Sequence, residues 1–356
     1  MVEMENVSKK YGPAEVVSNV TLRAEAGETL VIIGPSGCGK TTVLKMINRM
    51  VVNSSGSIKV NGININQVDP VELRRGIGYV IQQIGLLPHL TVQDNIAFVL
   101  QLMGVSRSIQ AERAKELIRL VGLHPEYLHK RPQHLSGGQQ QRIGVARALA
   151  ADPSVVLMDE PFGAVDPITR QQLQEMVLAL QREMRKTILF VTHDIQEAFK
   201  LGSRIAIMKE GKIVKIGTPI ELIREKDDFV HRLLGRRAIF DFLENVPVSA
   251  ALDPTVPVFT LGQNVAVKTE RWEYGMAIDF ERHFLGVVEK KHWGGSDNNF
   301  NHCGADSCRL TIKPEVSVSD AIQIMLWEGY RWLPVVQNEI FIGVVTFESC
   351  AKMMRE

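Results

Sequence analysis

A glycine-rich segment near the N-terminus has the residue types that bind the phosphates of a nucleoside triphosphate. It follows the pattern G-x-x-x-x-G-K-[ST], and its predicted phosphate contacts are Gly34, Pro35, Ser36, Gly37, Cys38, Gly39, Lys40, Thr41 and Thr42. Glycines let backbone N–H groups approach phosphate oxygens, and the start of a helix favours an anion. The Lys40 ammonium suits the β- and γ-phosphates, and the Thr41 hydroxyl suits Mg²⁺. We therefore predict a nucleotide site at residues 34–42, the phosphate loop.

Three apolar runs later in the chain end in polar side chains. Residues 155–158 lead into Asp159, suited to hold Mg²⁺ through water, and Glu160, suited to act on an attacking water. Two further runs end near Gln82 and His193. Because open α/β sheets place their ligands at the carboxyl edge of the strands, we expect these side chains to meet beside the nucleotide.

A second anion site is predicted at residues 135–139, which have the sequence L-S-G-G-Q. Ser136 is a helix-capping residue, and Gly137 and Gly138 leave backbone N–H groups accessible at the start of the helix that follows. The two anion sites lie far apart in the sequence, and one γ-phosphate could use both.

The elements that position these motifs follow from local patterns. Residues 29–33 are a β-branched apolar run typical of a buried strand, and residues 42–47 have helical spacing, so the phosphate loop joins a strand to a helix. The alternating segment 56–60 ends in Asn61-Gly62, a hairpin signal. The first 65 residues or so therefore predict an antiparallel β layer, and residues 94–134 a helical insert. Tyr11, at the end of the first predicted strand, could stack on a nucleobase or be structural.

Composition limits the remaining classes of function and cellular location. The 356 residues carry 41 Lys+Arg and 40 Asp+Glu, so no overall charge favours nucleic acid as a partner. Four cysteines form no disulfide pattern, and no signal peptide is evident. The longest stretch free of Asp, Glu, Lys and Arg, residues 76–93, contains glutamines, proline and histidine and is a poor membrane span. We expect a soluble cytoplasmic protein that contacts a membrane only through a partner.

Together these motifs resemble the nucleotide-binding subunit of an ABC transporter over about residues 1–235. The L-S-G-G-Q sequence is specific, because it separates this family from other phosphate-loop NTPases. Residues 163–166 depart mildly from the more common Ser-Ala-Leu-Asp but keep Asp166. The resemblance implies an α/β P-loop NTPase fold of ABC type, with a mixed-sheet core, an antiparallel β subdomain and a helical subdomain.

The same resemblance implies partners and residue roles. Two subunits would form a head-to-tail homodimer in which ATP lies between one phosphate loop and the other subunit's Ser136, Gly137 and Gly138, with Gln139 and Asp166 in the same ATP-binding set. Gln82 would sense Mg²⁺ and water, and His193 would contact the γ-phosphate. An integral-membrane permease would be contacted near residues 82–91, from Gln82 to Thr91.

Residues 236–356 contain none of these nucleotide-site motifs. They follow a basic hinge that is marked by Arg232, Arg236 and Arg237. The segment F-L-G-V-V at residues 284–288 echoes F-I-G-V-V at residues 341–345, with matching upstream pairs. These repeats resemble a pair of CBS domains in an α+β regulatory domain, a degenerate copy at about 245–300 and a better formed one at about 303–356. The first copy lacks a clear amphipathic helix around residues 260–271. The role of this regulatory domain has three alternatives. It could bind an adenine nucleotide such as cyclic di-AMP, sense ionic strength, or only dimerise.

An ABC ATPase followed by CBS domains resembles the osmoprotectant importers for glycine betaine, carnitine, choline or proline betaine. Such a subunit would lie on the cytoplasmic face of the inner membrane, bound through its permease, with an extracytoplasmic substrate-binding protein in the complex. An importer of another small solute such as an amino acid, and a non-transport ABC ATPase, stay open.

Three further features of the sequence allow more than one interpretation. All four tryptophans, at positions 272, 293, 327 and 332, lie in the C-terminal part. A cage for a quaternary amine is the less favoured interpretation, because the resembled family binds its solute on a separate protein. His292, His302, Cys303 and Cys308 fit no standard zinc spacing. Cys38 lies at a predicted helix start, which lowers a thiol pKa and favours alkylation, although a small filler role is the simpler interpretation.

Overall fold

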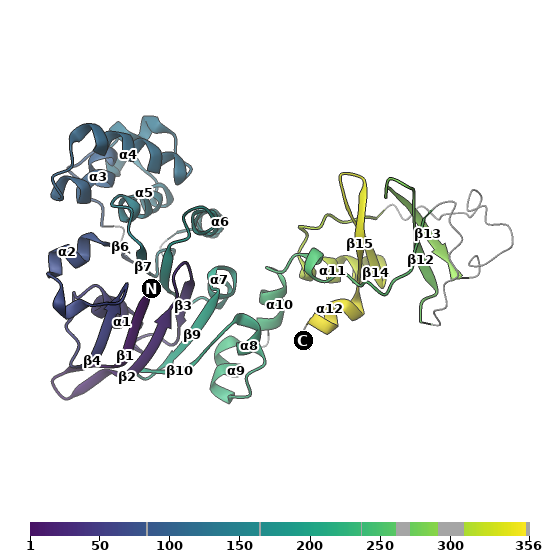
Figure 1. The fold of residues 1–356 in the computed structure, drawn as a ribbon, viewed down its shortest axis with the longest axis horizontal. Coiled ribbons are helices and arrows are strands. Elements are labelled where there is room, and N and C mark those ends of the chain that lie inside the picture. The colour runs from purple at the N-terminus through teal and green to yellow at the C-terminus, as the bar shows by residue number, and fades with distance from the viewer. Residues whose placement is uncertain (83–84, 164, 236, 261–270, 291–309, 354–356) are drawn as a thin grey trace. The chain divides into compact units, whose positions relative to one another are not determined.

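A computed structural model describes the chain except residues 83–84, 164, 236, 261–270, 291–309 and 354–356 (Figure 1). The chain divides into two compact units, Met1–Arg236 and Arg237–Glu356. Within the described residues, no helix is long and apolar enough to cross a membrane. Each unit has its own buried apolar clusters, so each is described by itself.

The central sheet of the first unit is mainly parallel. Its strands are β3 (Thr29–Ile33), β6 (Ile77–Val80), β7 (Val155–Asp159), β8 (Thr187–Val191), β9 (Arg204–Lys209) and β10 (Lys212–Gly217). They run in the order β10-β9-β3-β8-β7-β6, with β10 antiparallel to β9. Every residue of β3, β7 and β8 is buried, as expected for strands covered on both faces. The carboxyl ends of the parallel strands therefore share one edge, where the phosphate loop begins.

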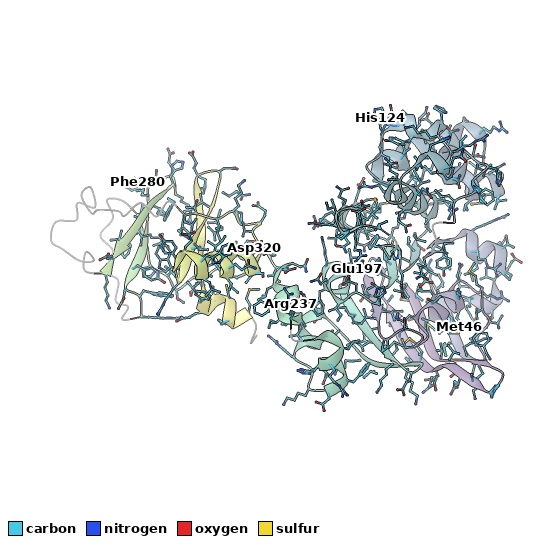
Figure 2. The ribbon with its side chains drawn as sticks, turned by 180° about the vertical axis from the view of Figure 1, so that it is seen from behind. Met46, His124, Glu197, Arg237, Phe280 and Asp320 are labelled. Atoms are coloured by element: carbon cyan, nitrogen blue, oxygen red, sulfur yellow. The ribbon has the colours of Figure 1, made fainter. Side chains whose placement is uncertain are left out.

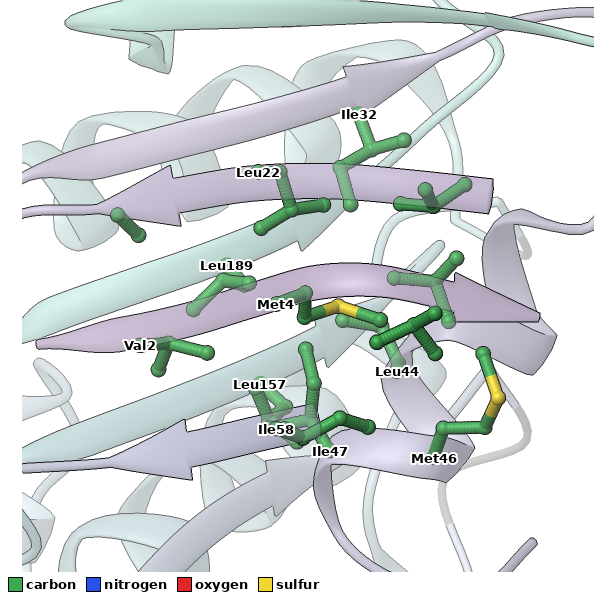
Figure 3. Close-up of a cluster of buried hydrophobic side chains, with 14 of the residues drawn as sticks. Val2, Met4, Leu22, Ile32, Leu44, Met46, Ile47, Ile58, Leu157 and Leu189 are labelled. Carbon is green, nitrogen blue, oxygen red and sulfur yellow. The ribbon is translucent and has the colours of Figure 1, made fainter. Parts of the chain in front are cut away.

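A second, antiparallel sheet confirms the predicted N-terminal β layer. It contains β1 (Val2–Tyr11), β2 (Ala14–Ala24), β4 (Ser55–Val60) and β5 (Ile63–Asn64), in the order β2-β1-β4-β5. Both Asn61 and Gly62 have positive φ, which suits the tight turn between β4 and β5. Met4 and Leu22 of this layer pack in one cluster with Leu44 and Leu189 (Figure 3). This cluster holds the layer against the central sheet.

Helices cover the sheets and form a separate insert. The covering helices are α1 (Lys40–Ile47), α2 (Pro70–Arg75), α6 (Pro167–Met184), α7 (Ile195–Leu201), α8 (Pro219–Ile223) and α9 (Asp228–Leu234). The insert consists of α3 (Val92–Leu102), α4 (Arg107–Leu120), the 3-10 turns Pro125–His129 and Pro132–His134, and α5 (Gly137–Leu149). We call residues 92–149 the helical subdomain; its helices gather together in Figure 1. The predicted helical insert is thus confirmed.

The second unit repeats one pairing pattern. Its elements are α10 (Ala238–Leu243), the turn Val248–Ala250, β11 (Val258–Thr260), β12 (Tyr274–Ile278), β13 (Phe284–Glu289), α11 (Val318–Glu328), β14 (Trp332–Gln337), β15 (Ile340–Thr346) and α12 (Phe347–Met353). β11 pairs in parallel with β12, which is antiparallel to β13. Likewise, Ile312 bridges in parallel to Val335 of β14, which is antiparallel to β15. The shared pattern supports the predicted repeat.

Two predictions for this unit concern residues that the structure does not describe. The helix expected to be missing from the first copy falls mostly on residues 261–270. The four candidate metal ligands His292, His302, Cys303 and Cys308 all lie within residues 291–309. Among the residues that the structure describes, no cluster of three or more His, Cys, Asp or Glu side chains could hold a metal ion.

Candidate functional site

The phosphate loop connects β3 to α1, as the sequence predicted. Two of its glycines are required by close backbone approach. A Cβ on Gly34 would lie 2.1 Å from the Met208 carbonyl oxygen, and one on Gly39 would lie 2.8 Å from the Val16 carbonyl oxygen. Gly39 also has φ 106 and precedes the first residue of α1. Contacts with β2 and β9 therefore determine the shape of the loop, and no ligand is needed to explain these two glycines.

Lys40 is buried within this loop. Its Nζ donates to the carbonyl oxygens of Gly34 (2.8 Å) and Pro35 (3.0 Å). The Sγ atom of Cys38 lies 4.0 Å from the same Nζ. Burial nevertheless raises the pKa of the Cys38 thiol, because it disfavours the thiolate more than Lys40 favours it. The predicted lowering of this pKa by the helix start is therefore wrong.

Thr41 and Asp159 meet where α1 begins and β7 ends. The Thr41 Oγ1 donates to Asp159 Oδ1 at 2.9 Å, and Asp159 is buried. Burial, with a smaller contribution from the neighbouring Glu160 carboxylate, raises the pKa of Asp159. A buried carboxylate beside a hydroxyl is a hard-oxygen donor set, and a cation there would offset the desolvation of the charge. These residues fit Mg²⁺.

Gln82, Glu160 and His193 converge at the carboxyl edge of the sheet. Oε2 of Glu160 accepts from Gln82 Nε2 at 3.3 Å and pairs with His193 Nδ1 at 3.1 Å. The three residues follow β6, β7 and β8, which are neighbours in the sheet. Glu160 also has φ 43, an unusual backbone angle for a residue with a side chain. The structure thus brings together three side chains that are 78 and 33 residues apart.

A partly buried network next to His193 in the sequence was not predicted. Thr192 donates through Oγ1 to Glu197 Oε2 at 2.6 Å, and Glu197, labelled in Figure 2, is almost fully buried. Arg170 of α6 lies 3.7 Å from Asp194 and 4.0 Å from Glu197. The sequence signal that could have revealed this network is Glu197, an acidic residue in the first turn of the helix that follows His193.

The L-S-G-G-Q segment begins α5. Ser136 and Gln139 form a reciprocal capping box, and Gln139 also reaches the Tyr127 hydroxyl. A Cβ on Gly138 would lie 2.2 Å from Thr169 Cγ2, so its glycine is explained by packing against α6. A Cβ on Gly137 would meet no heavy atom within 4 Å. The described structure therefore gives no packing reason for glycine at position 137.

Two other predicted nucleotide contacts have local partners. Asp166 caps α6 by accepting from the Thr169 N–H at 3.0 Å. Tyr11 is half exposed at the end of β1, and the Lys9 ammonium lies over its ring, 4.8 Å from the ring centre. Stacking of a base on Tyr11 stays a prediction.

The second unit contains a cavity of about 760 Å³ between the two segments predicted to be repeats. It is lined by Arg271, Trp272, Glu273 and Tyr274 from the first copy and by Arg331, Thr346, Phe347 and Glu348 from the second. Arg271 forms an ion pair with Glu348. The rings of Tyr274 and Trp332 lie 4.8 Å apart. Trp272 is buried, and among the described residues its indole N–H has no hydrogen-bond partner.

Comparison with known proteins gives concordant matches for both units. The model of the ABC transporter family matches residues 17–163, and the model of the CBS domain matches residues 308–356. The glycine betaine/carnitine/choline transport ATP-binding protein OpuCA of Bacillus subtilis is 43% identical, over 98% of this chain and 95% of its own. The osmoprotectant import ATP-binding protein OsmV of Salmonella typhimurium is 41% identical, over 95% and 92%.

A solved structure also resembles the chain. It is the dimeric structure of a post-hydrolysis state of the ATP-binding cassette MJ0796 bound to ADP and Pi. It is 36% identical with a TM-score of 0.56, and it covers 61% of this chain and 98% of that one.

Proposed function

The chain belongs to the ATP-binding proteins of the ABC transporter family, and on that basis we propose that it hydrolyses ATP to power import of a quaternary-amine osmoprotectant. Glycine betaine, carnitine, choline and proline betaine are the candidate solutes. The names of the nearly full-length relatives support this class of solute. The convergence of Gln82 and His193 on Glu160 is the observation that carries the hydrolytic role.

The geometry supports a division of roles at the catalytic edge. Glu160 is positioned to orient and polarise the water that attacks the γ-phosphate, and His193 to contact the transferred phosphoryl group. Lys40 would exchange its bonds to the Gly34 and Pro35 carbonyls for phosphate oxygens. Thr41, Asp159 and Gln82 would hold Mg²⁺, which supplies charge neutralisation at the phosphates when it is bound.

A composite site in a head-to-tail homodimer accounts for Gly137. Its backbone N–H lies at the start of α5, where an anion is favoured, and the space beside its Cα is open. We infer that the γ-phosphate held by the partner's phosphate loop approaches there, with Ser136, Gly138, Gln139 and Asp166 shaping the surroundings. The dimeric state of the related ATP-binding cassette supports this arrangement.

In the cell, the subunit would act within a membrane complex. We propose that residues 82–91 contact an integral-membrane permease on the cytoplasmic face of the membrane, and that an extracytoplasmic protein delivers the solute. The balanced charge of the chain gives no support to nucleic acid as a partner.

The cavity of the second unit supports a regulatory role. Aromatic side chains at Trp272 and Tyr274 suit a planar base, and Arg271 and Arg331 suit phosphates. An adenine nucleotide such as cyclic di-AMP is therefore one proposed ligand, and ionic strength is the alternative signal. Calorimetry of the full chain with cyclic di-AMP separates them, because a nucleotide sensor releases or absorbs heat on binding and a salt sensor does not.

Uptake assays test the central proposal. The chain is reconstituted with the permease and binding protein of its own transporter, and labelled glycine betaine, carnitine and choline are supplied with ATP. ATP-dependent uptake of one of them is expected, and Glu160→Gln is the inactive control. Uptake of an amino acid instead would favour the alternative importer, and ATP hydrolysis that no permease affects would favour a non-transport ABC ATPase.

A further inference from the structure

The residues on either side of His193 are tied together by one buried hydroxyl group. We propose that Thr192 and Glu197 are positioning residues that hold the His193 imidazole at the catalytic edge and so determine the rate of phosphoryl transfer. The inference rests on the proposed function, because it concerns the residue assigned to the transferred phosphoryl group. Neither Thr192 nor Glu197 belongs to the set of residues predicted to contact ATP.

Thr192 fixes the chain immediately before His193. It follows the last residue of β8 and is buried. Its backbone N–H donates to the Ile32 carbonyl oxygen of β3 at 3.2 Å, which attaches it to the strand that leads into the phosphate loop. Its Oγ1 accepts from the Asp194 N–H at 3.0 Å. The backbone on both sides of His193 is therefore attached to one residue.

Glu197 fixes the direction of that hydroxyl. It lies in the first turn of α7 and is buried. The Thr192 Oγ1 donates to Glu197 Oε2 at 2.6 Å, and the Glu197 N–H donates to Asp194 Oδ1 at 3.3 Å. With the bond from the Asp194 N–H, these contacts form a closed set of three hydrogen bonds, which we call the Thr192 network. Because the hydroxyl both donates and accepts within this set, its rotation is restricted.

Helix α6 supplies the partners that a buried carboxylate needs. The Arg170 Nε lies 4.0 Å from Glu197 Oε1, and the Arg170 Nη1 lies 3.7 Å from Asp194 Oδ2. Gln174, one turn further along α6, also forms a hydrogen bond with the Glu197 carboxylate. The carboxylate is therefore held both by α6 and by the residue that ends β8.

The His193 side chain depends on this backbone for its placement. It is 63% exposed, and its Nδ1 pairs with Glu160 Oε2 at 3.1 Å. An exposed imidazole is held by few packing contacts, so the backbone on either side sets its direction. A displacement of about 1 Å in a group that contacts the reacting atoms can cost on the order of 10²-fold in rate. The Thr192 network is therefore placed to control the rate through His193.

The test removes hydrogen bonds of the Thr192 network and uses another buried threonine as the control. Thr192→Val is nearly isosteric and loses both bonds of the hydroxyl, whereas Thr192→Ser keeps the hydroxyl. Glu197→Leu removes the acceptor, whereas Glu197→Gln keeps one. Thr187→Val is the matched control, because Thr187 lies at the opposite end of β8 with the same 2% exposure as Thr192. Its Oγ1 also makes two bonds, accepting from the Gly27 N–H (3.1 Å) and donating to the Glu25 carbonyl oxygen (3.2 Å).

Melting temperature, kcat and the KM for ATP are measured on the full chain. Thr192→Val and Thr187→Val should lower the melting temperature by similar amounts, because each loses two hydrogen bonds at a buried site. Only Thr192→Val should lower kcat, by about 10- to 100-fold, with KM within about twofold of wild type because the phosphate loop is unchanged. Thr192→Ser should restore most of the rate. Glu197→Leu should lower kcat as Thr192→Val does, and Glu197→Gln should retain most of it.

A double-mutant cycle with His193→Ala separates positioning from a purely structural role. In the His193→Ala background, Thr192→Val should change the residual kcat by less than about twofold, because no imidazole remains to be positioned. The same loss of kcat in both backgrounds would overturn the inference, and so would similar losses of kcat in Thr192→Val and Thr187→Val. A wild-type rate in His193→Ala would instead refute the role that the proposed function gives to His193, and the inference would fall with it.

Discussion

The two adjacent glycines at the start of α5 allow a paired test of the composite site. In Gly138→Ala, the new Cβ would overlap Thr169 Cγ2 at 2.2 Å, and a rotation of Thr169 would disturb its bonds with Asp166. Such overpacking costs about 1–3 kcal/mol, and the better helix propensity of alanine offsets up to about 1 kcal/mol of it. The largest cost less the full offset is a net loss of about 2 kcal/mol, which would lower the melting temperature of a unit this size by roughly 4–8 °C.

Gly137→Ala should behave in the opposite way. Its Cβ meets no heavy atom within 4 Å, so we expect the melting temperature to stay unchanged or to rise slightly. Its ATPase rate should nevertheless fall at least tenfold (about 1.4 kcal/mol in the barrier), because the methyl group occupies the path of the partner's γ-phosphate. Differential scanning calorimetry and steady-state ATPase assays measure the two effects. A Gly137→Ala protein that hydrolyses ATP at the wild-type rate would refute the assignment of this surface to the nucleotide.

Four further outcomes are expected. Glu160→Gln should keep ATP binding and lose roughly 10²- to 10⁴-fold in kcat, with an ATP-stabilised dimer accumulating on gel filtration; unchanged turnover would remove Glu160 from the reaction. Lys40→Ala should instead weaken ATP binding, measured by calorimetry. Because its pKa is raised, Cys38 holds less thiolate at neutral pH, so iodoacetamide should modify it more slowly than free cysteine and faster as the pH rises, followed by mass spectrometry. Truncation after Gly235 should leave an active ATPase, but solute uptake by the transporter that contains it should no longer respond to ionic strength or cyclic di-AMP. An unchanged response of uptake would exclude the sensor role.

Local patterns predicted the parts of the fold that depend on local interactions. The strand, loop and helix around residues 29–47 follow from a β-branched run, glycines and helical spacing, and the structure confirms them. The ABC ATPase fold and the C-terminal CBS domain, expected from the motifs, are also confirmed. The phosphate loop and the three residues at the sheet edge could be named because each follows a predicted strand.

Features that depend on tertiary contacts could not be predicted in this way. Thr192 resembles any threonine at the end of a strand until its bond to Glu197 is seen. The explanation for Gly138 lies in Thr169, more than thirty residues away along the chain. Cys38 was misjudged because a helix start is visible in the sequence, whereas the burial that dominates its pKa is not.

The distribution of tryptophan makes the second unit optically distinct. Unit Met1–Arg236 contains no tryptophan, so all indole emission comes from the C-terminal unit. Trp272 is buried beside the cavity, whereas Trp327 of α11 is 88% exposed, so a quencher in solution should reach the second far more readily than the first. A change in emission on addition of ATP that is present in the unmodified chain and lost in Lys40→Ala would therefore signal communication from the ATPase unit to the CBS unit, without any label.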